Sequence, residues 1–210
     1  MPLRKVLFLK DNFYHIYNRG NRKAQIFFED KDYLRFLEKA EKYRQKYPVE
    51  VICFCLLPNH FHFILKQNSD VLISRFMGTL LNSYARYASV KYNLPPGHVF
   101  QGRFGSKLIK NGESLLQANR YIHLNPIKER ILNLDFTNHR GRSIKTKSLL
   151  NQLRQYPWSS YQIYLPNPKT KSPLTINREI ILTEFKSPSN YRRFIEAKIS
   201  NSDILLLEDF

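Results

Sequence analysis

Four stretches of the chain have the side-chain pattern of β-strands. Residues 7–20 are predicted to form a strand that enters a loop. Tyr14, Ile16 and Asn18 alternate with His15, Tyr17 and Arg19, and Gly20-Asn21 supplies the turn. Val49 to Leu57 is a β-branched and apolar run, and Pro58-Asn59 after it is a tight-turn pair. His60 to Lys66 is a second apolar strand, so these two strands are expected to form a hairpin. A further strand or ribbon is predicted over Val99 to Lys110.

Three other stretches have the apolar period of helices. The first begins at Asp30 or Asp32, either of which can cap it, and the second runs from Ser69-Asp70 to about Tyr92. The third runs from about Gly112 to the Asn125-Pro126 step, where proline disfavours helical geometry. The apolar faces of the first two helices are Tyr33, Phe36, Leu37, Ala40, Tyr43 and Tyr47, and Ile73, Phe76, Met77, Leu80, Leu81, Tyr84 and Tyr87.

The order of these elements is strand, helix, strand, strand, helix, strand, and then an extra helix. This βαββαβ order predicts an α+β fold of the ferredoxin-like split type, an antiparallel sheet with helices on one face. We expect residues 1–132 to form this domain and residues 133–210 to be a basic C-terminal extension that packs partly on it. The extension has no acidic residue between Arg140 and Lys171, and it holds the only tryptophan, Trp158.

The charge balance narrows the class of partner. The chain has 34 Lys and Arg against 17 Asp and Glu, a formal net charge of +17, and 14% of its residues are aromatic. Such a composition is typical of a nucleic-acid binder. A membrane surface is the weaker alternative, because no basic amphipathic helix dominates the sequence. No apolar run is long enough for a membrane span or a signal peptide, so we expect a cytoplasmic protein.

Candidate metal ligands come from the second strand of the hairpin. Residues two apart on a strand share a face, so His60 and His62 point the same way and Phe61 and Phe63 point the other way. Two neighbouring imidazoles can chelate a divalent ion. A His-x-His pair alone is only moderately specific, but the apolar flanks indicate an interior strand, where unpaired imidazoles are costly.

A nucleophile and a third ligand are candidates on the third helix. Tyr121 and Asn125 are four residues apart, so a phenol and an amide oxygen lie along one edge of that helix. The alternatives are a tyrosine at the edge of the core and an asparagine that caps the helix. Pro126 is expected to end or kink the helix, which leaves the direction of the Asn125 side chain open.

Five segments together resemble the single-tyrosine HUH transposases and, more narrowly, the REP-associated tyrosine transposases. They occur in the family's order at residues 14–20, 58–62, 99–104, 120–126 and 156–161. The resemblance implies an enzyme with a catalytic domain in residues 1–132 that cleaves and rejoins hairpin-bearing single-stranded DNA through a covalent 5′-phosphotyrosine.

The resemblance also assigns roles to individual residues. Tyr121 would be the nucleophile, and His60, His62 and Asn125 the metal ligands. Since an ordinary phenol has a pKa of about 10, its attack needs a polarised phosphate held in line, which a divalent ion provides. Two imidazoles, one amide oxygen and waters suit Mg²⁺ or Mn²⁺.

Several further residues are candidates for contacts with DNA. Arg103 and Arg120 could each clamp a phosphate, with a surface salt bridge as the alternative. Tyr17 and Phe104 could stack on bases, although core packing is the stronger expectation for both. We expect His123 to face solvent or DNA. The other basic residues predicted to contact DNA are Lys107, Lys110, Arg140 and Arg142.

Two other classes of protein remain in competition. One is a catalytically inactive or domesticated DNA-binding protein of the same fold, which has no need for the full set His60, His62, Tyr121 and Asn125. The other is a replication-initiator or relaxase nuclease, which commonly carries paired tyrosines and helicase domains. Monomer and homodimer are both open.

Overall fold

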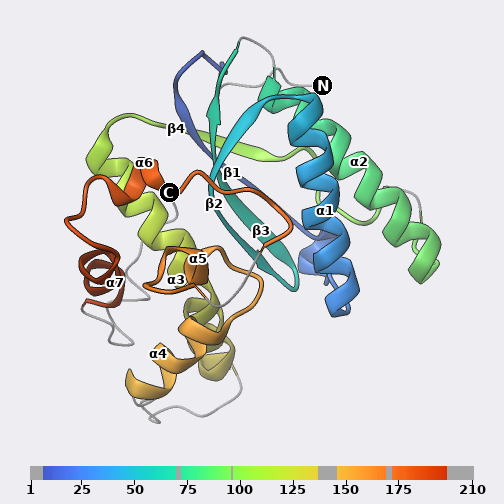
Figure 1. Ribbon diagram of the computed structural model, residues 1–210. Coiled ribbons are helices and arrows are strands. Elements are labelled where there is room, and N and C mark those ends of the chain that lie inside the picture. Colours follow the sequence, from blue (N-terminus) through green and yellow to red (C-terminus); the bar gives the residue numbers. More distant parts are fainter. Residues whose placement is uncertain (1–6, 70–71, 96, 137–145, 169–171, 198–210) are drawn as a thin grey trace.

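The β-sheet has the strand order expected for a ferredoxin-like fold. The computed structural model describes residues 7–69, 72–95, 97–136, 146–168 and 172–197, with the backbone only for 72 and 129–136. In these residues one antiparallel sheet of four strands has the order β2-β3-β1-β4 (Figure 1). This confirms the predicted α+β arrangement. The strands are β1 (Phe13–Arg19), β2 (Val49–Leu57), β3 (His60–Gln67) and β4 (Gly105–Ile109).

The turn between β2 and β3 holds the end of β1 in place. The Asn59 carbonyl accepts a hydrogen bond from the Gly20 N–H at 2.7 Å. In the resulting register, Tyr17 lies opposite His62 and Arg19 lies opposite His60. Alternate residues of β1 therefore share a face with the two histidines.

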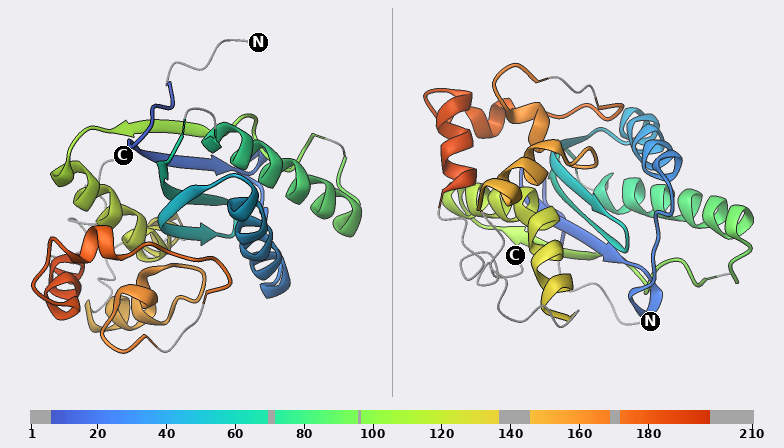
Figure 2. Two further views of the ribbon diagram at one scale, coloured as in Figure 1. Left: turned by 45° about the horizontal axis from the view of Figure 1, so that its top comes forward. Right: turned by 90° about the horizontal axis from the view of Figure 1, so that it is seen from below.

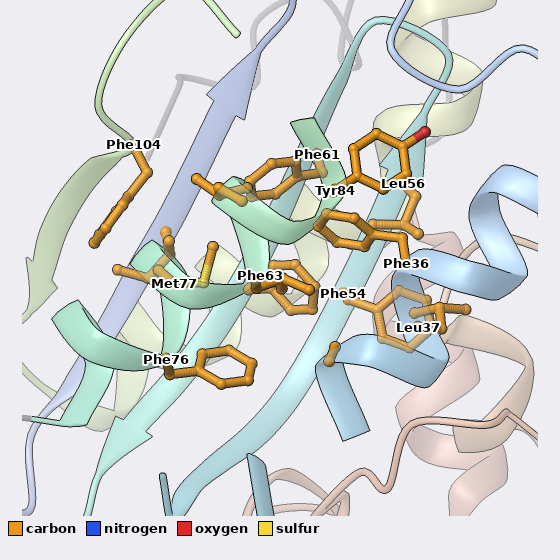
Figure 3. Close-up of a cluster of buried hydrophobic side chains, with 14 of the residues drawn as sticks. Phe36, Leu37, Phe54, Leu56, Phe61, Phe63, Phe76, Met77, Tyr84 and Phe104 are labelled. Atoms are coloured by element: carbon orange, nitrogen blue, oxygen red, sulfur yellow. The ribbon is translucent and has the colours of Figure 1, made fainter. Parts of the chain in front are cut away.

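The first face of the sheet is covered by α1 (Asp30–Lys46) and α2 (Leu72–Tyr92). Phenylalanine rings dominate the core between them, and the ring of Phe36 contacts those of Phe61 and Phe63 (Figure 3). At the start of α1, Asp32 accepts hydrogen bonds from the backbone N–H groups of Phe28 and Glu29. The predicted apolar positions that are buried here are Tyr33, Phe36, Leu37, Ala40, Ile73, Phe76, Met77, Leu80, Leu81 and Tyr84.

The second face of the sheet is covered by α3 and by the C-terminal helices (Figure 2). The boundary expected between residues 132 and 133 falls within α3 (Gly112–Phe136), and the described part of the extension shares an apolar core with that helix. The remaining helices are α4 (Thr146–Gln155), α5 (Tyr161–Tyr164), α6 (Glu179–Leu182) and α7 (Pro188–Glu196). None of the described helices is both long and apolar enough to cross a membrane.

The expected end of the third helix at Pro126 is wrong. The helix α3 continues through Pro126 to Phe136, although proline has no N–H to donate to the Ile122 carbonyl. Leu124 and Ile127 on either side are fully buried. Burial of two such side chains contributes about 3–6 kcal/mol, which offsets the roughly 3 kcal/mol that an interior proline costs. Lys128 is therefore on the same helix as Tyr121.

Candidate active site

A pocket of about 800 Å³ lies between the sheet and α3. From β3 it is lined by His60 and His62, and from α3 by Tyr121, Asn125 and Lys128. The fold thus brings together the four residues that sequence reasoning selected as nucleophile and ligands. The pocket is also lined by His15, Tyr17, Arg103 and Lys107.

His62 is the more buried of the two candidate histidine ligands. Its Nδ1 lies 2.9 Å from Nε2 of His15, and its Nε2 is buried without a hydrogen-bond partner among the described residues. Burial, together with the nearby His15, His60 and Lys128, lowers the pKa of His62 well below its ordinary value. The ring is therefore neutral at physiological pH, as a metal-binding imidazole must be.

His60 is half-buried and lies at the start of β3. Its Nδ1 is 2.7 Å from Oδ1 of Asn59, the residue of the preceding turn. The rings of His60 and His62 are perpendicular, with centroids 5.0 Å apart. In both histidines a neighbouring side chain lies within hydrogen-bonding distance of Nδ1, and Nε2 of His62 is the buried nitrogen without a partner among the described residues.

Tyr121 presents its buried ring to the histidines from α3. Its centroid lies 5.6 Å from that of His62 and 6.0 Å from that of His15, both edge-on. One turn further along, Asn125 Nδ2 donates a hydrogen bond to the Tyr121 carbonyl at 3.0 Å. Two turns along, the Lys128 Nζ lies 5.0 Å from the centroid of the Tyr121 ring. The tyrosine ring thus has both imidazoles and an ammonium group as close neighbours.

The donor set fits a hard or borderline divalent ion. Within the described residues, no cluster of three His, Cys, Asp or Glu side chains forms a ready metal site. Asn125 lines the same pocket, and its Nδ2 rather than its amide oxygen contacts the Tyr121 carbonyl, so that oxygen can serve as a third protein ligand. The orphaned Nε2 of buried His62 supports a ligand at this position, because an unpaired buried polar atom is otherwise costly. Two nitrogens, an amide oxygen and waters are compatible with Mn²⁺ or Mg²⁺.

Only some of the basic residues predicted to contact DNA lie at the pocket. Arg103 and Lys107 line the pocket, whereas Lys110 lies exposed beyond the end of β4 and outside the lining. Arg120 is away from the pocket. Its guanidinium donates to the carbonyls of Phe194 and Ala197, at 3.2 and 2.6 Å, and so joins α3 to the end of α7. Arg140 and Arg142 lie outside the described residues.

The two aromatic residues considered for base stacking also lie in different places, one in the core and one at the pocket. Phe104 is buried in the core of the first face, as expected. Tyr17 lines the pocket, and its ring lies across Gly105 of the neighbouring strand, where a Cβ atom would come within 2.4 Å of the ring. Only glycine at that position leaves room for the Tyr17 ring.

The expectation that His123 faces solvent or DNA is wrong. The ring is fully buried, with Nδ1 2.6 Å from the Tyr191 hydroxyl and Nε2 2.9 Å from Oγ of Ser160. Burial lowers the pKa of His123 to about 3. This histidine therefore joins the C-terminal helices to α3 and has no part in the pocket.

Several residues that line the pocket were not predicted from the sequence, and two of them, His15 and Lys128, lie against the candidate catalytic residues. The position of His15 depends on the register between β1 and β3, which no local pattern reveals. Lys128 lies beyond Pro126, where the helix was expected to have ended.

The comparison with known families shows to which family the chain belongs. Residues 9–125 match the model of the IS200-like transposase family, so the chain belongs to that family. Over 107 residues it is 26% identical to a protein from Haemophilus influenzae described as a REP-associated tyrosine transposase. That match covers 46% of this chain and 61% of the relative, less than two thirds of its length. The resemblance found in the sequence is confirmed.

A solved structure has the same fold. It is a REP-associated tyrosine transposase bound to a REP hairpin, with a TM-score of 0.55 and 17% sequence identity. The likeness covers 85% of this chain and 96% of that one, so it extends beyond the residues matched by the family model.

Proposed function

We propose that this chain is a divalent-metal-dependent transposase that cleaves and rejoins single-stranded DNA through a 5′-phosphotyrosine on Tyr121. The observation that supports this most strongly is the convergence of Tyr121, His60, His62 and Asn125 on one pocket. These four residues come from two elements about 60 positions apart in the chain. A protein that only binds DNA has no need of a phenol beside two imidazoles in a pocket with basic residues.

His60 and His62 through Nε2, and Asn125 through its amide oxygen, are the proposed ligands of the metal. When bound, Mg²⁺ or Mn²⁺ supplies a Lewis acid that polarises the scissile phosphate. Arg103, Lys107 and Lys128 add positive charge around the phosphate. All of these groups are held in place by a strand or helix, or by a loop packed beside one, which suits a reaction that depends on positioning.

Tyr121 performs the covalent step. Its Oη forms a bond to phosphorus while the bond from phosphorus to the 3′ oxygen breaks. The phenolic proton is lost, the departing 3′ oxygen gains a proton, and the 5′-phosphate stays on the tyrosine. A different 3′-hydroxyl can reverse this step and rejoin the strands, because a phenolate is a fair leaving group.

Hairpin-bearing single-stranded DNA is the proposed substrate. The solved relative of the same fold holds a REP hairpin, and the net charge of +17 favours a polyanion. The alternative is a catalytically inactive or domesticated protein that binds such a hairpin without cutting it.

A covalent-adduct assay separates these functions. The protein is mixed with Mn²⁺ and a 3′-labelled oligonucleotide that contains an imperfect palindrome from the DNA flanking the gene, and run on a denaturing gel. We expect labelled protein from the wild type, and more than about a thousandfold less from Tyr121→Phe or in chelator. Tyr43→Phe, which changes a half-buried tyrosine on the other face, is the matched control and should form the adduct.

The outcomes are distinct. An adduct with Tyr121→Phe contradicts the nucleophile, and equal adducts in chelator contradict the metal. If the wild type binds the hairpin but forms no adduct, the chain is the DNA-binding alternative.

A further inference from the structure

A buried pair of imidazoles joins β1 to the candidate ligand His62. His15 is 2% exposed, and its Nε2 lies 2.9 Å from Nδ1 of His62. The two rings are stacked, with centroids 5.1 Å apart and an interplanar angle of 23°. Because His15 pairs with Ile64 in the sheet, it is the diagonal neighbour of His62 on the same face.

The contact between the two nitrogens needs one donor and one acceptor. If His15 donated, His62 would carry its own proton on Nε2, which would be a buried donor without an acceptor among the described residues. If His62 donates from Nδ1, its Nε2 instead presents a lone pair on the pocket side. The second arrangement avoids the unsatisfied donor and leaves a nitrogen suited to a metal.

We propose that His15 is a positioning residue, which accepts the Nδ1 proton of His62 and thereby fixes the ring and tautomer that bind the divalent ion through Nε2. This inference rests on the proposed function, because it assigns a role beside that metal. Residues that hold the second nitrogen of a metal-binding histidine orient the ring and strengthen the ligand.

The other histidine of the pocket has the same arrangement. Asn59 Oδ1 lies 2.7 Å from Nδ1 of His60, so each candidate ligand has an acceptor at Nδ1. One acceptor comes from the turn before β3, and the other comes from the adjacent strand β1. His15 is not a third ligand in this arrangement, because its Nε2 is directed at His62 and not at the pocket.

A purely structural role for His15 is the competing explanation. Its ring also packs near Tyr17 and Tyr121, at centroid distances of 5.2 and 6.0 Å. Two substitutions separate the roles. His15→Gln keeps an acceptor near the position of Nε2, whereas His15→Leu fills similar space without one.

The test is Mn²⁺ binding by the full-length protein without DNA, followed by electron paramagnetic resonance. We expect His15→Leu to weaken Mn²⁺ binding about 10- to 100-fold, and His15→Gln to restore most of it. His62→Ala should remove the site. Melting by circular dichroism shows whether each variant is folded, and packing alone would not let Gln rescue the affinity.

The two proposals fail in different ways. If His62→Ala binds Mn²⁺ as the wild type does, the metal site of the proposed function is wrong. If His62→Ala loses the ion but His15→Leu matches the wild type, or His15→Gln is as weak as His15→Leu, only the role of His15 is overturned.

A second measurement needs no variant. Long-range proton–nitrogen NMR spectra of the metal-free wild type report which imidazole nitrogen carries the proton. We expect the proton of His62 on Nδ1. A proton on Nε2 would overturn the inference even if His15→Leu does not fold.

Discussion

The two faces of the sheet bury different kinds of side chain. On the face covered by α1 and α2, the core is apolar and rich in phenylalanine, and its buried charge is Asp32. Gln67 is a buried amide on the same face, and its side chain is hydrogen-bonded to Phe8 and Ile73. The face covered by α3 also has an apolar core, but it additionally buries imidazoles together with amides. These are His15, His62, His123, Asn119 and Asn125.

The shape of the surface does not distinguish the faces. A groove between α1 and α2 has a volume of about 800 Å³, like the pocket against α3. Its lining includes Arg35, Arg86 and Lys91, but no histidine or carboxylate is among the residues that line it. Burying polar groups weakens a core, so a face that does so without full pairing indicates a site. We therefore expect substitutions on the first face to change stability and those in the pocket to change chemistry.

Phe36→Ala tests the structural side of this comparison and should have the largest effect. The ring is fully buried against Phe61 and Phe63, so its removal should lower the free energy of unfolding by about 3–5 kcal/mol. Urea denaturation measures this loss. Mn²⁺ affinity of the folded fraction should stay as in the wild type.

The control for this prediction is Leu34→Ala on the exposed side of the same helix. Leu34 is 41% exposed, so its loss should cost less than about 1 kcal/mol. A fall in Mn²⁺ affinity with Phe36→Ala, measured where the protein is folded, would show that the two faces are coupled.

Asp32→Asn should have the next largest effect. Burial acts to raise the pKa of Asp32, but hydrogen bonds from Lys91, Tyr92 and Tyr87 and from the Phe28 N–H hold it at about 2. Because this folded pKa is below the unfolded value of 3.8, the stabilisation is present above pH 4 and is lost as the pH falls towards 2. It amounts to about 2 kcal/mol at neutral pH.

Urea denaturation at two pH values checks the direction in which the stabilisation by Asp32 changes with pH. The advantage of the wild type over Asp32→Asn should be about 2 kcal/mol at pH 6 and roughly half of that at pH 3. An advantage that grows as the pH falls would contradict the assignment. Adduct formation at pH 7 should be unchanged, since Asp32 lies on the face away from the pocket.

The sequence predicted the parts of both faces that depend on local spacing. The faces of α1 and α2 follow from helical periodicity, and the shared direction of His60 and His62 follows from their spacing on one strand. His15 could not be found in this way. Its contact with His62 joins residues 47 positions apart and depends on the pairing of β1 with β3.

The C-terminal extension explains the wrong prediction for His123 and the unforeseen contacts of Arg120. The sequence after residue 133 gives only a weak pattern of elements, so it does not show what packs against α3. In the structure, α7 contributes the Tyr191 hydroxyl to His123, and the carbonyls that Arg120 contacts belong to Phe194 and Ala197. A helix in isolation does not show which of its polar residues a later segment will cover.

Lys128→Gln has the smallest expected effect and tests the functional side of the comparison. The Lys128 ammonium lies 5.0 Å from the centroid of the Tyr121 ring and lines the pocket, so it adds positive charge where the phosphate and the attacking oxygen meet. Its loss should slow adduct formation in single-turnover experiments about tenfold, or about 1.4 kcal/mol. The free energy of unfolding should change by less than about 1 kcal/mol.

Lys110→Gln is the matched control, because Lys110 is exposed and lies outside the pocket lining. The same charge is removed, so a general loss of attraction for DNA would slow both variants equally. A slower reaction for Lys128→Gln alone would place the effect at Tyr121. Equal rates, or a loss of stability with unchanged chemistry, would mean that Lys128 only packs on the ring. In that event charge beside the nucleophile would not be part of what distinguishes the α3 face.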